Sequence, residues 1–361
     1  MSTGTHTVAD LLANRALAEQ RIAEFGEENL VGPVQEALVA HNWNVGAMMA
    51  ELADETTERM ETYGADTGGR MKRGEESGRV ATEKGARKGK VAYPYELFEH
   101  AVGFTREFML RETVRGLLEK ELGARMRHLT TLREEIRRAF FFPTNYTFYD
   151  VLHDDIDLVV RRLANADGEP IPTSDAGTNF NGSTHSHYLA TASVGGQGLA
   201  DALKALIDTV VEHDHVDDLR LNISSQDEGT VRALPGFLPY VEEGVAAGTA
   251  TDRANGVAVR RATNRAIGRF GGAEVWTRTW VPKGYFHAYA AGDRRKPLAI
   301  RVDELPHLRG LILAATVDIY PLRANNYEAR FGIGVKNRTN GAVLWADAAS
   351  GGVYSPPTGL S

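Results

Sequence analysis

Apolar residues recur at helical spacing in the first part of the chain. In Thr7–Met60, residues such as Leu11, Leu17 and Ile22 lie on one face of an amphipathic helix, and a later set continues this pattern. Polar residues interrupt the pattern near His41–Asn44. The sequence therefore predicts an arm of two or three helices, with a break at that point.

A second helical pattern covers Thr105–Ala139, where apolar residues recur at gaps of three and four. A continuous helix of this length would span about 50 Å at 1.5 Å per residue. Gly116 and Gly123 each cost roughly 1 kcal/mol against alanine, so we expect a bend or break near them. Thr105 is a suitable N-cap, and Pro143 cannot continue the helix.

The middle of the chain mixes strands and helices. Short strands alternate with turns over Asn145–Val194, and Leu199–Val211 has the pattern of an amphipathic helix. Leu219–Ile223 is typical of a strand and Gln226–Leu234 of a helix. Val241–Arg265 has little periodicity and is predicted to be a surface loop.

The last third is rich in β-branched and aromatic residues bounded by glycine and proline, which predicts strands. The overall class is therefore α+β. The expected strands are Val275–Val281, Tyr285–Tyr289, Leu298–Val302, Gly310–Tyr320 and Phe331–Leu344.

Between the two helical regions lies Gly64–Lys90, a run of glycine and charge with almost no apolar residues. It holds seven glycines, eight basic and four acidic residues, a local excess of 8 − 4 = +4. Such a segment cannot bury enough apolar surface to offset the entropy of ordering it. We therefore expect contacts with another copy of the chain to hold it. The candidate contact residues are Arg70, Lys72, Arg73, Glu75, Glu76, Arg79, Lys84, Arg87, Lys88 and Lys90.

Composition narrows the class of protein. A chain of 361 residues predicts two domains, or one domain with arms. A net charge of −7 argues against a general nucleic-acid-binding surface, and the lack of cysteine excludes disulfides and thiolate chemistry. We find no membrane-spanning run and no signal-peptide pattern, so we expect a soluble protein made in a cytoplasm, with no membrane partner.

The histidines form the most enzyme-like pattern. His185 and His187 form one His-x-His pair, and His213, His215 and Asp217 form His-x-His-x-Asp, a fragment of a known metal-binding pattern. The second group follows a predicted helix, where histidine also suits the negative helix end. We therefore interpret it as a solvated helix terminus and expect no metal and no cofactor. A metal-dependent enzyme using the four histidines is the alternative.

Other motifs are weaker. The glycines at 195, 196 and 198 precede a helix but lack a dinucleotide or phosphate-loop pattern. Asp154, Asp155 and Asp157 are expected to lie on a solvated strand or turn. Gly332–Gly334 predicts a bulge or a close backbone approach within a strand. No catalytic motif emerges, so we expect a protein that is not an enzyme.

The order of these parts resembles the major capsid proteins of tailed double-stranded DNA phages, the Hong Kong phage-type fold. The strings that carry the resemblance are IGRFGGAEVWTRTWVPKGYFHAYAAG (Ile267–Gly292), Pro297–Trp345 and LRLNISSQDEGTVRAL (Leu219–Leu234). The resemblance implies a helical N-terminal arm, an extended β-hairpin loop, a peripheral domain with a long spine helix, and an axial α/β domain. Carried over by position, these are 1–60 (arm), 61–104 (extended loop), 105–165 and 293–340 (peripheral), and 166–292 and 341–361 (axial).

The resemblance also implies a function. The chain would assemble with itself into the hexamers and pentamers of an icosahedral virion shell, formed in the host cytoplasm around weakly contacted DNA. A separate scaffolding protein, a portal and a decoration protein are the other expected partners. A shell of the related encapsulin type, which packages cargo enzymes, is the alternative. One branch of the family crosslinks a loop lysine to an asparagine, for which Lys72, Lys84, Lys88 or Lys90 and Asn337 or Asn340 are the candidates.

Overall fold

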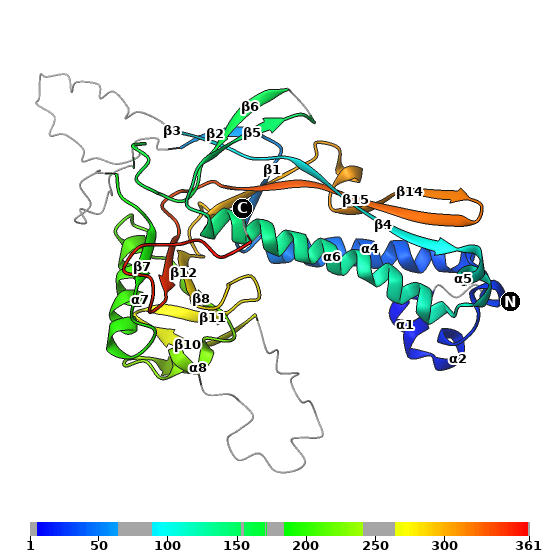
Figure 1. Ribbon diagram of the computed structural model, residues 1–361, viewed down its shortest axis with the longest axis horizontal. Helices are drawn as coiled ribbons and strands as arrows, with labels where there is room; N and C mark the ends of the chain where they lie inside the picture. Colours follow the sequence, from blue (N-terminus) through cyan, green and yellow to red (C-terminus); the bar gives the residue numbers. More distant parts are fainter. Residues whose placement is uncertain are drawn as a thin grey trace, which may run out of the picture.

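The computed structural model describes residues 6–63, 89–152, 155–169, 171, 184–240 and 264–359. These residues form two lobes of different shape (Figure 1). The elongated lobe holds the N-terminal helices, the longest helix and a five-stranded sheet. The compact lobe holds a seven-stranded sheet drawn from 188–290 and 342–346.

The N-terminal region contains the short helices α1 (Val8–Ala13), α2 (Arg15–Ala18) and α3 (Ile22–Phe25), and the longer α4 (Glu28–Met49). The break expected near residues 41–44 is wrong, because α4 is continuous there. His41 lies on the buried face of α4 together with Leu38 and Val45, so its burial continues the apolar face instead of ending it.

The second helical region is divided into α5 (Arg106–Arg111) and α6 (Val114–Phe141). The side chain of Thr105 caps α5, and α6 ends two residues before Pro143, as predicted. The break does not fall at either glycine, because both lie inside α6. It falls at 112–113, where backbone hydrogen bonds from Ile22 to Glu112 and from Val114 to Gln20 hold the chain extended. A contact with distant residues therefore places the break.

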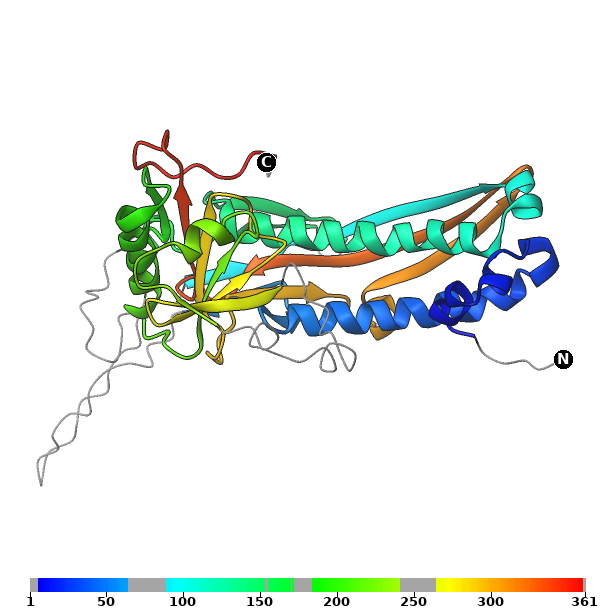
Figure 2. The ribbon, with the colours of Figure 1, turned by 90° about the horizontal axis from the view of Figure 1, so that it is seen from below.

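The elongated sheet has the order β1-β13-β15-β14, with β4 also paired to β15. In Figure 2, β15 runs between α6 and α4; α6 packs on β15 and β4, and α4 packs on β14. Two of these strands, β1 and β4, were not predicted; residues 53–56 were expected to be helical. The strand bounds are β1 Ala53–Thr56, β4 Glu96–Thr105, β13 Leu298–Val302, β14 Leu311–Ile319 and β15 Leu322–Val335.

The strand predicted over residues 331–344 is two strands in different sheets. β15 ends at Val335 in the elongated lobe, and β16 (Ala342–Ala346) lies in the compact lobe. The residues between them carry the chain from one lobe to the other. The close backbone approach predicted for Gly332 is confirmed, because a Cβ built there would lie 1.9 Å from the carbonyl oxygen of Pro94.

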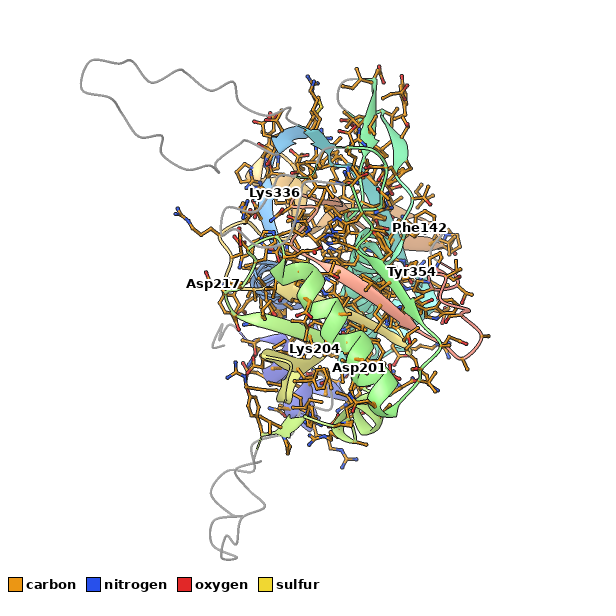
Figure 3. The ribbon with its side chains drawn as sticks, turned by 90° about the vertical axis from the view of Figure 1, so that its left-hand side faces the viewer. Phe142, Asp201, Lys204, Asp217, Lys336 and Tyr354 are labelled. Atoms are coloured by element: carbon orange, nitrogen blue, oxygen red, sulfur yellow. The ribbon has the colours of Figure 1, made fainter. Side chains whose placement is uncertain are left out.

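The compact lobe is a mixed sheet covered by α7 (Gly196–Val211), whose apolar face packs on β16 and β12. Figure 3 views this lobe end-on, with Asp201 and Lys204 on the opposite, polar face of α7. The predicted helix and strand after α7 are confirmed as α8 (Glu228–Arg232) and β8 (Leu219–Ile223). The sheet order is β7-β16-β12-β8-β11-β10-β9, with β7 Tyr188–Thr191, β9 Leu238–Pro239, β10 Arg265–Phe270, β11 Ala273–Thr277 and β12 Tyr285–Ala290.

Two antiparallel ribbons complete the described fold: β2 (Met60–Tyr63) with β3 (Gly89–Ala92), and β5 (Tyr146–Asp150) with β6 (Ile156–Val160). The β2–β3 ribbon flanks residues 64–88, which lie outside the described residues together with the predicted loop at 241–263. A short 3₁₀ helix, η1, covers Pro306–Leu308. Among the described residues, no helix is both long and apolar enough to cross a membrane.

Candidate functional site

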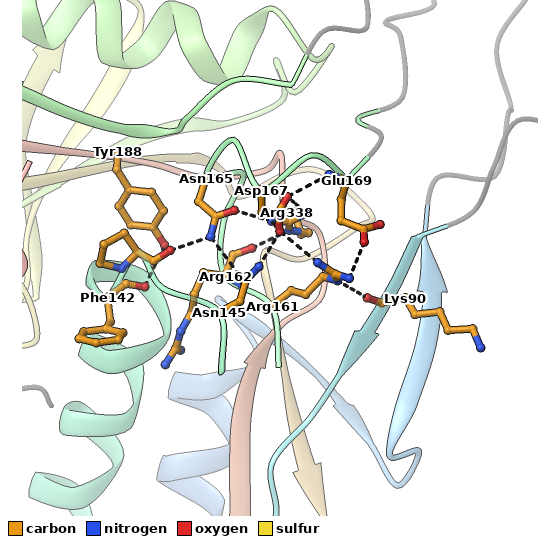
Figure 4. A network of polar contacts seen from close by, with 11 residues as sticks. Lys90, Phe142, Asn145, Arg161, Arg162, Asn165, Asp167, Glu169, Tyr188 and Arg338 are labelled. Atoms are coloured by element: carbon orange, nitrogen blue, oxygen red, sulfur yellow. Dashed lines mark hydrogen bonds and ion pairs between the residues drawn. The ribbon is translucent and has the colours of Figure 1, made fainter. Parts of the chain in front are cut away.

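A dense polar network lies where the chain crosses between the lobes (Figure 4). Its centre is Arg338, which lies between β15 and β16 and is almost fully buried. Its guanidinium donates to both carboxylate oxygens of Asp167, at 2.7 and 3.3 Å, and to Asn165 Oδ1 at 3.0 Å. Its Nε donates to the carbonyl oxygen of Arg162 at 2.8 Å. Arg338 therefore joins the segment between β15 and β16 to the segment that follows β6.

The Asp167 carboxylate and the Arg338 guanidinium carry opposite charges and stabilise each other. Partial burial by itself would raise the pKa of Asp167, but the Arg338 guanidinium and the amide of Asn145 hold that pKa below its usual range. A planar guanidinium that binds both oxygens of a carboxylate fixes direction as well as distance. The pair therefore fixes the position of the segment after β6 relative to the segment between β15 and β16.

Arg161 connects this network to the β2–β3 ribbon. It donates to Asp167 at 3.1 Å, to Glu169 at 2.5 Å and, through Nε, to the carbonyl oxygen of Lys90 at 3.1 Å. Lys90 lies in β3, with an exposed side chain. β2 and β3 flank residues 64–88 within the predicted extended loop (61–104), so Arg161 ties the β3 side of this ribbon to the Arg338 network.

Beside β3, the chain also packs tightly on β15. The missing side chains of Gly332 and Gly334 allow Pro94 and Tyr93 to approach closely, and a Cβ on Gly334 would lie 2.8 Å from the Tyr93 ring. Lys336 adds ion pairs to Asp54 and Glu61 at 3.0 and 3.5 Å. The base of the loop therefore rests on a rigid strand rather than on a flexible connection.

A second junction lies at the end of α4. The Glu51 carboxylate accepts hydrogen bonds from Arg220 at 2.5 Å, from Tyr289 at 2.9 Å, and from Arg278. Both arginines also lie over the ring of Trp276. Since Glu51 belongs to the N-terminal region and its partners to the compact lobe, this cluster is a second fastening between the two lobes.

Of the ten predicted contact residues, the structure describes only Lys90; the other nine lie outside the described residues. The crosslink acceptors differ in accessibility. Asn340 is fully buried, and its side-chain amide bonds to the backbone of Ala290 and Arg295. Asn337 is only partly buried, so of the two asparagines it alone has a side chain accessible to a neighbouring lysine.

The histidines are where the sequence interpretation was wrong. His213 and His215 follow α7, as expected, but both are buried, and His187 is fully buried, so this is not a solvated helix terminus. The Nε2 atoms of His185, His187 and His213 lie 3.1–3.2 Å from one another. His215 is separate from this group and contacts Asp293 and Thr339 instead.

Glu212 is a member of this cluster that the sequence analysis missed. Its Oε1 lies 2.8 Å from His185 Nε2 and 3.6 Å from His213 Nε2. The only sequence signal was its position directly before His213. Asp155 and Asp157 are exposed at the start of β6, and Asp154 lies outside the described residues. Gly195 caps α7, whereas Gly196 and Gly198 lie inside it. None of these gathers comparable groups among the described residues.

Several large apolar side chains remain exposed on the elongated lobe. Val31, Val39 and Trp43 lie on one face of α4 at spacings of eight and four residues, and Trp43 is 74% exposed. Ile319 and Tyr320 are exposed at the tip of the β14–β15 hairpin, at the end of the lobe far from the compact lobe (Figure 1). A partner that covered these side chains would bury apolar surface that is now in contact with water.

Comparison with solved structures identifies the fold. A structure from Mycobacterium phage Patience matches with a TM-score of 0.65 and 18% sequence identity, covering 100% of this chain and 98% of that chain. The chain has the Hong Kong phage-type capsid fold. The sequence resemblance to this fold is therefore confirmed. No protein-family model and no curated protein sequence matches the chain.

Two further solved structures match over most of this chain. The capsid of a native GTA particle matches with a TM-score of 0.47 and 14% identity, covering 83% of this chain and 90% of that chain. The holo-SrpI encapsulin complex from Synechococcus elongatus PCC 7942 matches with a TM-score of 0.43 and 12% identity, covering 85% and 88%.

Proposed function

We propose that the chain is the major capsid subunit of a tailed double-stranded DNA phage and has no catalytic activity. The observation that carries the proposal is the match over the whole length of both chains to a phage structure of the same fold. A match over the whole length includes the N-terminal helices and both lobes. The subunit would assemble with itself into hexamers and pentamers of a closed shell located in the virion.

The domain roles follow from this proposal. The compact lobe would be the axial domain at the centre of each hexamer or pentamer, and the elongated lobe would be the peripheral domain with α6 as its spine helix. The two junctions at Arg338 and Glu51 support this assignment, because a subunit shared among many contacts needs a fixed angle between its lobes. Residues 61–104 would be the extended loop that reaches a neighbouring subunit.

Assembly would bury surface at several separate places on each subunit. The exposed apolar face of α4 and the hairpin tip of β14–β15 are the described surfaces that best suit such contacts. Scaffolding, portal and decoration proteins and weakly contacted DNA remain the other proposed partners, and host cytoplasm the proposed place of assembly. Charged pairs at subunit contacts would mainly set register, since rim charges add little affinity.

The proposal is tested by the size and content of what the full chain forms. Sedimentation of the purified chain should yield particles far larger than the 39.4 kDa subunit. Particles from infected or lysogenic cells should contain double-stranded DNA. Particles that contain protein cargo but no DNA would favour the encapsulin-type shell instead. A chain that stays monomeric under all assembly conditions would contradict both kinds of shell.

A further inference from the structure

The four-residue cluster at the edge of the compact lobe has a geometry that hydrogen bonding cannot explain. A neutral imidazole Nε2 is either a donor or an acceptor, not both. Three nitrogens that all lie 3.1–3.2 Å apart form three pairs, and at most two of these can join a donor to an acceptor. At least one pair must therefore place two like groups at hydrogen-bond distance.

The tautomer of His187 is fixed by a contact with the backbone. Its Nδ1 lies 2.7 Å from the carbonyl oxygen of Gly341, and a carbonyl oxygen only accepts, so Nδ1 carries the proton. The Nε2 of the neutral ring then directs a lone pair at His185 and His213. Metal-binding histidines commonly donate their other ring nitrogen to a carbonyl oxygen in this way, which fixes the ring and its tautomer.

We propose that His185, His187, Glu212 and His213 bind one Zn²⁺ ion as a structural site. Three imidazoles and one carboxylate are a ligand set that suits this ion. The ligand atoms all lie within 4.8 Å of one another. Tetrahedral zinc with bonds of about 2.0–2.1 Å separates its ligands by about 3.3–3.4 Å. The three nitrogens at 3.1–3.2 Å and the Glu212 oxygen at 2.8 and 3.6 Å bracket that value.

The chemistry of the ligands also suits a cation, because zinc is bound by neutral imidazoles and ionised carboxylates. Glu212 supplies negative charge that partly offsets the two positive charges of the ion.

The site would have a structural role and not a catalytic one. Four protein ligands complete a tetrahedral shell, whereas catalytic zinc keeps one position open for water or substrate. His187 directly precedes β7, and Glu212 and His213 directly follow α7. The ion would therefore tie the entry of the edge strand to the end of the helix that covers the sheet. This inference does not depend on the proposed shell function.

The test measures zinc binding by the full-length chain after removal of metal with a chelator. Titration calorimetry with Zn²⁺ should give one site per chain, and the cobalt-loaded protein should show the visible absorption of tetrahedral Co²⁺. His185→Ala and Glu212→Gln are the test variants, because both side chains lie at the partly exposed edge of the cluster. The control is His307→Ala, which removes an exposed histidine elsewhere.

The expected result is a loss of zinc affinity in His185→Ala of more than the 10–100-fold typical of outer-shell changes. Glu212→Gln should weaken binding and alter the cobalt spectrum, and His307→Ala should change neither. The proposal is overturned if the unaltered chain binds no zinc. It is also overturned if His185→Ala binds zinc as tightly as the unaltered chain. Equal weakening in His307→Ala would overturn it too, because it would indicate binding by surface histidines in general.

Discussion

Replacing Gly332 by alanine tests how tightly the base of the extended loop is fixed to β15. The new Cβ would lie 1.9 Å from the Pro94 carbonyl oxygen and 2.4 Å from its carbonyl carbon. Real Cβ contacts are essentially never shorter than 3.0 Å, so the two backbones must separate by at least 3.0 − 1.9 = 1.1 Å. Gly332 lies in β15 and Pro94 in the three-residue connection between the paired strands β3 and β4, so neither backbone can rotate away freely.

The cost of such overpacking is typically about 1–3 kcal/mol and occasionally more. A matched control exists in the same sheet: Gly103 of β4 has no atom within 4 Å of an added Cβ. Gly103→Ala should be neutral or stabilise the chain by about 0.4–1 kcal/mol, because alanine restricts the unfolded state. The two variants should therefore differ by about 1–4 kcal/mol in free energy of unfolding.

Urea unfolding of unassembled subunits, at one protein concentration for all variants, measures this difference. The Gly332→Ala midpoint should fall with an unchanged m-value, which indicates a loss of stability and not a change in the unfolded state. Hydrogen exchange should show the loss of protection concentrated in β3 and β15. Equal midpoints for the two variants would refute the argument that this approach is a rigid contact.

Three further predictions address the junction, the helix pair and the outer surface. Arg338→Met should cost about 3–5 kcal/mol because it leaves buried polar partners unpaired, whereas Arg309→Met, at a more exposed ion pair, should cost under about 1 kcal/mol in the same denaturation assay. Burial and the nearby His41 lower the pKa of His128 to about 4, so stability should be complete above about pH 6.5 and fall as pH drops from 6.5 to 4. His128 of α6 lies 2.9 Å from His41 of α4, so His128→Gln should reduce that slope, and an unchanged slope would exclude this histidine pair as its cause. Trp43→Ser should change subunit stability by less than about 0.5 kcal/mol yet reduce the assembled fraction in sedimentation. Full assembly of this variant would show that the exposed face of α4 is not a subunit contact.

The sequence pattern predicted those elements that are determined by nearby residues. The strands Leu219–Ile223 and Leu298–Val302 and the end of α6 before Pro143 follow from residue type and spacing alone. β1 and β4 could not be predicted in this way, because they become strands by pairing with β13 and β15, which lie more than 200 residues away in sequence. The break at 112–113 has the same origin in a distant backbone contact.

The candidate sites show the same limit. The two His-x-His pairs were visible in the sequence, but their meeting depends on packing that joins residues 26 to 28 positions apart. Their burial could not be predicted, since helix ends are usually solvated. Arg338 and Asp167 carried no signal at all, because a charged residue that fixes a lobe junction resembles any surface charge until the fold places it.

The central claim is that this chain forms a closed shell with its compact lobes at the centres of hexamers and pentamers. A reconstruction by electron cryomicroscopy of particles assembled from the full chain tests it most directly. The account predicts compact lobes around the fivefold and sixfold positions, with residues 64–88 in contact with a neighbouring subunit. Particles whose symmetry axes are surrounded by the elongated lobes, or a preparation that contains only single 39.4 kDa chains, would contradict it.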